Sequence, residues 1–259
     1  MNDFLPINRN DMNQRGWEEL DFIFVSGDAY VDHPSFGPAI ICRLLEKHGY
    51  RVGLIAQPDW HSTDDFKRLG RPRLGFLVSS GNLDSMLNKF TAAKKTRHSD
   101  AYSPGGKAGC RPDRAVVVYS NRLREVWKDV PIIIGGIEAS LRRFAHYDYW
   151  SNMIRRSILF DSRANLLIYG MGERQILEIA AQLQQGIAVT DITTVRGTAC
   201  LLKELDSIWE YKEIPSYEAV IADKAVFAQA FKEEYLEQDA IRGRTVVQRC
   251  GNHFVVQNP

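Results

Sequence analysis

The chain has 259 residues, of which 44% are hydrophobic and 25% are charged, and its net charge is +1. This composition is ordinary for a soluble globular protein, and the length is enough to bury a real core in one large domain or two. The near balance of charge argues against an overall attraction to nucleic acid or to an anionic membrane surface.

The sequence contains no targeting or membrane signal. No apolar run approaches the roughly 20 residues that a membrane helix needs, and the polar N-terminal residues have no signal-peptide core. These features predict a cytoplasmic protein. The cysteines are far apart and form no C-x-x-C pair, which argues against a zinc site and against a disulfide framework. They are Cys42, Cys110, Cys200 and Cys250.

Strand and helix patterns alternate through most of the chain, after an irregular arm over residues 1–20. Strands are expected at residues 21–27, 51–56, 74–79, 130–134 and 165–169, and helices at residues 38–48, 63–69, 114–128 and 175–185. Short links join the first three strands, which is typical of a doubly wound parallel sheet with right-handed crossovers. We therefore predict an α/β, flavodoxin-like fold.

Residues 89–114 interrupt this alternation with a basic, turn-rich insertion. Its lysines and arginines outnumber its aspartates, Asp100 and Asp113, and Ser103–Gly106 has the turn-forming sequence SPGG. Long loops of this kind in compact domains are either functional or disordered. We favour a solvated, mobile loop, and a lid or a polyanion contact is the alternative.

Val130–Ile134 is an apolar run of mostly β-branched residues, which is typical of a strand buried on both faces. It ends at Gly135 and Gly136, and Glu138 and Ser140 follow where a helix begins. Backbone N–H groups at a helix start favour anionic or polar ligand groups. Sites in open α/β sheets lie beyond the carboxyl ends of the strands. The turn therefore predicts the floor of a ligand site, although a tight βα connection without a ligand fits the same residues.

A second glycine turn follows the strand expected at residues 165–169. Gly170 and Gly172 precede a helix, and Glu173 falls in its first turn, where a carboxylate suits the helix dipole. Gln175 takes the third glycine position of a dinucleotide fingerprint. This turn therefore argues against nicotinamide or flavin binding.

The character of the sequence changes after Gly186, and a domain boundary is expected at residues 186–200. Short strands are expected at residues 192–202, helices at residues 216–237, and a hairpin at residues 244–249 and 253–257. A terminal hairpin leaves an unpaired edge that folded proteins usually cover. This pattern indicates the front part of a longer protein.

The predicted organisation has two parts. Residues 1–190 form an α/β domain that carries the insertion at residues 89–114. Residues 191–259 form an extension of helices and a hairpin.

No complete catalytic or metal-binding constellation is present in the sequence. Asp28, Asp32 and His33 form the densest group of ionisable residues, at the carboxyl end of the first strand. They fit a metal site or an acid/base pair. They also fit turn chemistry, in which aspartate side chains hydrogen-bond their own backbone.

Residues 141–163 mix aromatic side chains with arginine. Such a mixture can stack on nucleic acid bases, and it is also typical of docking surfaces between domains. We favour the docking surface, because the rest of the chain is neutral.

Four motifs resemble one protein family. They are GDAYVDHPSFG (27–37), LVSSGNLDSM (77–86), GGIEASLRRFAHYDYW (135–150) and YGMGER (169–174). Together they resemble the N-terminal region of the YgiQ family of radical SAM proteins, and the match runs through nearly the whole chain. The resemblance implies a cobalamin-binding-like accessory domain with a small-molecule ligand. It also implies a downstream radical SAM domain as partner. The mixture of aromatic side chains and arginine predicts that residues 142–156 face that domain.

The resemblance implies a ligand cleft at residues 28–37, 79–82, 135–140 and 170–173. The cofactor-binding residues that we expect there are Asp28, Asp32, His33, Gly135, Gly136, Glu138, Ser140, Gly170, Gly172 and Glu173. We expect no catalytic residue and no metal ligand in this chain.

Two departures from the family pattern limit this expectation. The radical SAM signature C-x-x-x-C-x-x-C is absent. The four-iron four-sulfur cluster and S-adenosylmethionine are therefore expected only in full-length family members, and this chain is not expected to be catalytic alone. The cobalamin motif D-x-H-x-x-G is also altered, because Asp32 and His33 are adjacent and Gly37 lies four residues after His33. Three alternatives stay open: a cobalamin bound without a protein histidine, another ligand, or no ligand.

Two other functions remain open from the residues alone. A self-contained α/β enzyme would use Asp28, Asp32 and His33, which must then converge within about 3 Å of one reacting atom or metal. An RNA-binding module would use the two basic segments, and its affinity would fall steeply with salt.

Overall fold

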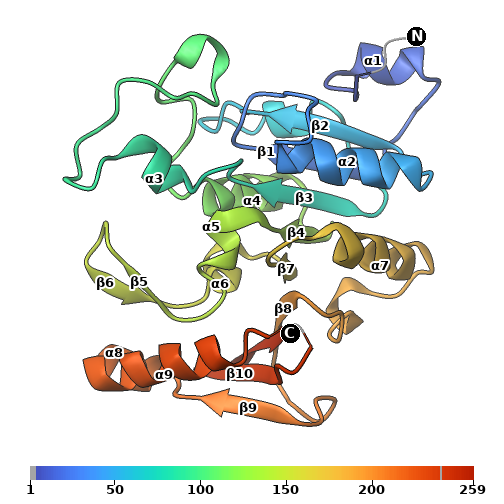
Figure 1. Cartoon of the computed structure of the whole chain (residues 1–259). Helices are drawn as coiled ribbons and strands as arrows, with labels where there is room; N and C mark the ends of the chain where they lie inside the picture. The colour runs from blue at the N-terminus through green and yellow to red at the C-terminus, as the bar shows by residue number, and fades with distance from the viewer. Residues whose placement is uncertain (1–3, 240) are drawn as a thin grey trace.

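The computed structural model describes residues 4–239 and 241–259. One nine-stranded sheet runs through the molecule from the top to the bottom of Figure 1, in the order β2-β1-β3-β4-β7-β8-β11-β10-β9. The first five strands in this order are parallel to one another, the next three pairs (β7–β8, β8–β11 and β11–β10) are antiparallel, and β10 and β9 are parallel. The sheet is therefore mixed but mostly parallel.

The parallel half has the predicted doubly wound, flavodoxin-like arrangement. Its strands are β1 (Phe22–Ser26), β2 (Val52–Ala56), β3 (Gly75–Ser79), β4 (Ile132–Ile134) and β7 (Leu166–Ile168). The chain winds outward in opposite directions from β1 and β3, which lie side by side in the sheet. This point is the topological switch point, where open α/β sheets bind their ligands. The predicted α/β class is confirmed.

Helices cover both faces of the parallel half. One face carries α2 (Gly37–Lys47) and α7 (Glu173–Gln184), and the other carries α4 (Ala115–Val126) and α6 (Ile158–Ser162). Within β1, Ile23 and Val25 pack toward α4, whereas Phe22 and Phe24 pack toward α2. Because alternate side chains of each strand are buried on opposite faces, the strands are continuous apolar runs in the sequence.

The C-terminal half of the sheet consists of β8 (Thr198–Leu202), β9 (Tyr211–Ile214), β10 (Thr245–Cys250) and β11 (His253–Asn258). The predicted hairpin is present as β10 and β11. The expectation that it leaves an unpaired edge is wrong, because β11 pairs with β8 and β10 pairs with β9. β8 also pairs with β7, so the sheet continues without a break across residue 190. A division at that residue stays a prediction.

Short elements fill the connections between these strands and helices. They are α1 (Arg9–Gln14), η1 (Asp65–Lys67), α3 (Ser85–Lys89), η2 (Pro104–Gly106), α5 (Gly136–Ser140), β5 (His146–Asp148), β6 (Met153–Arg155), η3 (Val189–Asp191), α8 (Tyr217–Ala222) and α9 (Lys224–Leu236). The N-terminal arm is more regular than predicted, because Asn8 caps α1 and Met12 is fully buried. Within the described residues, every helix is too short or too polar to cross a bilayer.

The insertion at residues 89–114 is not simply the solvated loop that its composition favours. Lys94 and Lys95 are exposed, but Asp100, Ser103 and Arg111 are buried. The insertion folds back so that Tyr102 accepts a backbone hydrogen bond from Ala29, just beyond β1. Its buried residues therefore belong to the carboxyl edge of the sheet.

Candidate functional site

A cavity of about 300 Å³ lies at the carboxyl ends of the parallel strands, between α2 and α7. Its floor is one row of side chains across the sheet, because Phe24 pairs in register with Leu77 and Leu77 with Ile133. Ile41 of α2 and Ile176 of α7 form its walls. The cavity therefore spans the switch point between β1 and β3, where the topology predicts a ligand site.

Glycine turns form the rim of this cavity. Gly135 and Gly136 follow β4, and Gly170 and Gly172 follow β7, and all four line the cavity together with Glu173. Gly136 has a φ of +80°, and a Cβ there would lie 3.4 Å from the Cβ of Ser79. The structure thus brings five of the predicted site residues to one place. Their contact with a ligand remains a prediction.

The predicted group of Asp28, Asp32 and His33 does not converge on the cavity. Asp32 forms an ion pair with Arg43 of α2. His33 is exposed, and its Nδ1 accepts the N–H of Ser35 at 3.1 Å. Neither residue lines the cavity, and each side chain of the group has a different partner. The arrangement does not fit an acid/base pair built from these residues.

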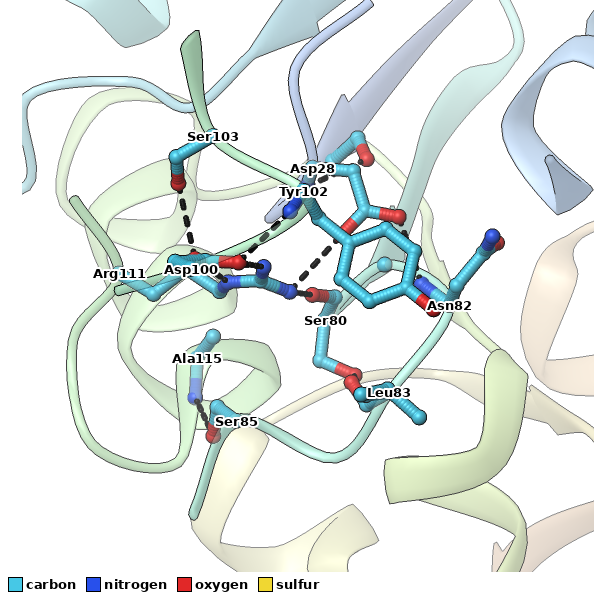
Figure 2. A network of polar contacts seen from close by, with 12 residues as sticks. Asp28, Ser80, Asn82, Leu83, Ser85, Asp100, Tyr102, Ser103, Arg111 and Ala115 are labelled. Atoms are coloured by element: carbon cyan, nitrogen blue, oxygen red, sulfur yellow. Dashed lines mark hydrogen bonds and ion pairs between the residues drawn. The ribbon is translucent and has the colours of Figure 1, made fainter. Parts of the chain in front are cut away.

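Asp28 instead belongs to a buried ion network with Arg111 and Asp100 of the insertion. Figure 2 shows the Arg111 guanidinium between the two carboxylates, at 2.8 Å from Asp28 Oδ1 and 2.8 Å from Asp100 Oδ2. The three side chains are 3%, 0% and 3% exposed for Arg111, Asp28 and Asp100. Arg111 also donates to the carbonyl of Ser80 at 2.9 Å. The insertion is therefore fixed to the ends of β1 and β3.

The two carboxyl groups of this network titrate differently. Burial raises the pKa of Asp28, and its hydrogen bonds from Asn82 and Arg111 offset this only in part. Burial also acts on Asp100, but hydrogen bonds from Arg111, Tyr102 and Ser103 outweigh it and lower the pKa of Asp100. The opposite pKa shifts follow from the balance at each carboxyl group between burial, which favours the neutral form, and hydrogen bonds and the Arg111 charge, which favour the ionised form.

The network also positions part of the cavity wall. The N–H of Asn82 donates to Asp28 at 2.7 Å, and a Cβ on Gly81 would lie 2.0 Å from the same carboxylate. Gly81 and Ser79 line the cavity. The sequence gives no sign of this arrangement, because Asp28 and Arg111 are 83 positions apart and Arg111 lies among exposed basic residues.

Glu138 and Ser140, which we expected at the ligand site, have structural partners. Glu138 is fully buried and accepts the N–H groups of Ser85 at 2.8 Å and Val116 at 2.9 Å. These donors lie in the first turns of α3 and α4, where N–H groups lack helical partners. Burial raises the pKa of Glu138, and the nearby Asp84 acts in the same direction. The Ser140 hydroxyl donates to the Gly136 carbonyl at 2.8 Å, and neither side chain lines the cavity.

The cysteines do not fit an iron–sulfur cluster. Cys42 and Cys200 are buried in the core, where burial raises the pKa of Cys42 and raises that of Cys200 to about 12. A cluster ligand must be a thiolate. Across the described residues, no three His, Cys, Asp or Glu side chains are grouped so that they could hold a metal ion. A histidine-ligated cobalamin is not supported either, because His33 does not line the cavity.

The comparisons with known proteins agree with the predicted resemblance. A family model described as Radical SAM N-terminal matches residues 4–259. A UPF0313 protein of Clostridium botulinum is 60% identical over 257 residues, which cover 99% of this chain and 40% of the relative. A UPF0313 protein of Clostridium perfringens is 57% identical over 258 residues, with 99% and 39% covered. The chain thus spans about 40% of the length of these curated relatives.

One solved structure with a similar arrangement is the radical S-adenosylmethionine methyltransferase TsrM from Kitasatospora setae. That structure holds a tryptophan substrate and an S-adenosylmethionine analogue. The two chains are 15% identical with a TM-score of 0.45, and the match covers 69% of this chain and 28% of TsrM.

Proposed function

This chain belongs to the radical SAM N-terminal family, and from that premise we propose that it is the accessory, ligand-binding domain of a longer radical SAM protein. One observation carries the proposal. The glycine turns after β4 and β7 meet at one cavity, at the switch point of a sheet whose sequence matches this family over residues 4–259. Ligands of open α/β sheets bind at that place.

The cysteines indicate which part of the longer protein would bind which cofactor. The cluster and S-adenosylmethionine would be held by the part of the longer protein that lies outside the match, since the cysteines here do not fit a cluster. The present residues would bind a small molecule and present it to that part. The cytoplasmic location inferred from the sequence belongs to the same proposal.

The surface beside the cavity supports a docking role. Leu87 of α3 and Leu141, which follows α5, are 54% and 58% exposed. The N–H of Ser85 donates to Glu138, and Asp84 forms an ion pair with Arg142, so these two segments are held together. Contiguous exposed apolar surface marks interaction sites. We propose that the remaining part of the longer protein covers this surface.

The arginine- and aromatic-rich segment fits the docking role only in part. Phe144 is buried in the core, so it cannot take part, and this expectation is wrong for that residue. Tyr147, Tyr149 and Met153 are about half exposed on or beside the β5–β6 hairpin, which lies near α3 in Figure 1. The hairpin would extend the docking surface beyond α3.

A chimera tests the proposal. The matching region of the Clostridium botulinum relative is replaced by this chain, and the product is reconstituted with iron and sulfide under anaerobic conditions. We expect the chimera to bind a cluster and to cleave S-adenosylmethionine reductively, and this chain alone to do neither. Cluster binding by the isolated chain, or a folded chimera without a cluster, would contradict the proposal.

A further inference from the structure

The lining of the cavity differs from that of a phosphate or nucleotide site. Its floor and walls are hydrophobic, with Phe24, Leu77 and Ile133 below and Ile40 and Ile176 at the sides. Among the described residues that line it, Glu173 has the single ionisable side chain, and none is lysine or arginine. The lining therefore has no fixed positive charge that would attract an anionic ligand. Its one carboxylate, that of Glu173, would repel such a ligand.

The size of the cavity limits what it can hold. Its volume of about 300 Å³ is at the small end of ligand sites, which run from about 300 to 1,000 Å³. A single ring system or a side-chain-sized group fits this volume, whereas a whole dinucleotide does not. The inserted part of the ligand is therefore small and contacts mainly carbon atoms.

The two helices that flank the cavity add a polar element at its rim. Both α2 and α7 begin at the cavity, and neither has a side-chain cap. Free N–H groups at a helix start attract hydrogen-bond acceptors, and the helix dipole alone would favour an anion. Glu173 already places a carboxylate in the first turn of α7. A neutral acceptor satisfies the N–H groups without charge repulsion.

We propose that this cavity binds an uncharged, largely apolar group with a neutral hydrogen-bond acceptor at its edge, and that Glu173 excludes anionic ligands. The proposal rests on the ligand-binding role given above and names the chemical class of the ligand. It narrows the expectation drawn from the helix start, that the turn favours anionic or polar ligand groups, to neutral ones.

Two fluorescent probes with one ring skeleton test the proposal on the 259-residue chain. Prodan is neutral and carries a ketone oxygen as acceptor on a single naphthalene ring system, and 6-dimethylaminonaphthalene-2-sulfonate carries a sulfonate in place of the ketone group. We expect the neutral probe to show saturable fluorescence enhancement and the sulfonate to bind at least about tenfold more weakly, because the Glu173 carboxylate at the cavity opposes its charge. Glu173→Gln should strengthen sulfonate binding about tenfold and leave the neutral probe unchanged.

Cavity-filling variants show whether the probes enter this cavity. Ile41→Trp, on the wall, should abolish binding of the neutral probe, and Ile221→Trp, on the exposed surface of α8, should not. Ile40→Trp, which is half-buried and lines the same wall, replaces Ile41→Trp if that variant does not fold. Thermal unfolding of each variant confirms that it is folded.

The outcomes separate this inference from the proposed function. Equal binding of both probes before and after Glu173→Gln, or binding that survives the filled cavity, would overturn the inference. A chimera that cleaves S-adenosylmethionine while the cavity binds no neutral probe would keep the accessory role and reject the ligand class. Selective probe binding with an inactive chimera would keep the ligand class and reject the radical SAM role.

Discussion

At the scale of single residues, Arg111 is a buried side chain with several charged and polar partners. It lies between two buried carboxylates, those of Asp28 and Asp100, and all three side chains are at most 3% exposed. Removing one partner of a buried ion pair leaves an uncompensated charge, which costs about 3–5 kcal/mol. We therefore expect Arg111→Met to lower the free energy of unfolding by about that amount in urea titrations.

Arg71→Met is the matched control for this prediction. Arg71 pairs with Asp129 at 2.8 Å with similar geometry, but the two side chains are 50% and 72% exposed. Exposed ion pairs contribute little to stability, so this variant should unfold at nearly the wild-type urea concentration. If both variants lose the same free energy of unfolding, burial does not make the Arg111 ion network more stabilising than an exposed ion pair.

His146 supplies a prediction about pH. Burial lowers its pKa from 6.5 to about 4, and Arg142 and Arg155 act in the same direction against a hydrogen bond to the Phe144 carbonyl. Between these two values the unfolded chain binds a proton that the folded chain does not, so stability falls as pH falls from about 6.5 to 4. The melting temperature measured across this range should drop less in His146→Gln.

His48→Gln is the control for the pH prediction. His48 is exposed at the end of α2, where its Nδ1 lies 2.8 Å from the Leu44 carbonyl. This variant should keep the acid-dependent drop of the wild-type chain. If His146→Gln also shows the full fall in melting temperature at acid pH, a group other than His146 causes that fall.

At the scale of elements, the sequence predicts what depends on local pattern. The apolar runs at β1, β3, β4 and β7 and the glycine turns at Gly135 and Gly170 follow from periodicity and backbone freedom. The partners of charged side chains do not. Asp32 binds Arg43 and Glu138 binds two helix starts because the fold brings these groups together. The positions of both carboxylates after predicted strands, together with the family motifs, therefore predict a ligand role that these partners do not reflect.

The insertion at residues 89–114 shows the same limit. Its lysines predict solvent exposure, and Lys94 and Lys95 are indeed exposed. The structure buries Arg111 of the same segment because Asp28 and Asp100 compensate its charge. Buried charges are tolerated only when paired, and pairing across the chain has no local pattern.

The β5–β6 hairpin makes a prediction about docking. Tyr147 and Met153 are 49% and 52% exposed, so a double Tyr147→Ser and Met153→Ser variant should leave the unfolding of this chain nearly unchanged. In the chimera the same substitutions should increase proteolytic cleavage between this chain and the remaining part, because they remove apolar area from the docking surface. Ile221→Ser, on α8, is the exposed control. Equal cleavage in both variants would place the docking surface elsewhere.

At the scale of the whole molecule, the two halves of the sheet share one core. On the α4 face, Val246 and Val255 pack in the same cluster as Ile132 and Leu167. On the α2 face, Val247 and Val256 pack with residues of the parallel strands. Both faces are therefore completed by strands that follow residue 190.

This shared core predicts that residues 1–190 do not fold alone. Ending the chain at residue 190 removes β8, the hydrogen-bonded neighbour of β7, and uncovers apolar side chains on both faces. An exposed strand edge next to apolar surface promotes aggregation. Size-exclusion chromatography and circular dichroism should show aggregated or unfolded material for residues 1–190, and one cooperative transition for all 259 residues.

Val246→Ala and Ile221→Ala distinguish this view from the two-part division within the intact chain. Val246 is fully buried in β10, in the same cluster as residues of the parallel half, and Ile221 is 51% exposed. If the sheet unfolds as one unit, Val246→Ala shifts the single transition by about 1–3 kcal/mol, and Ile221→Ala leaves it nearly unchanged. If residues 1–190 are an independent domain, Val246→Ala splits the transition and leaves the unfolding of the parallel half where it was. Hydrogen exchange at β1 and β3, which lie far from the substitution in the sheet order, distinguishes the two views. Faster exchange there in Val246→Ala indicates one unit, and unchanged exchange indicates an independent domain.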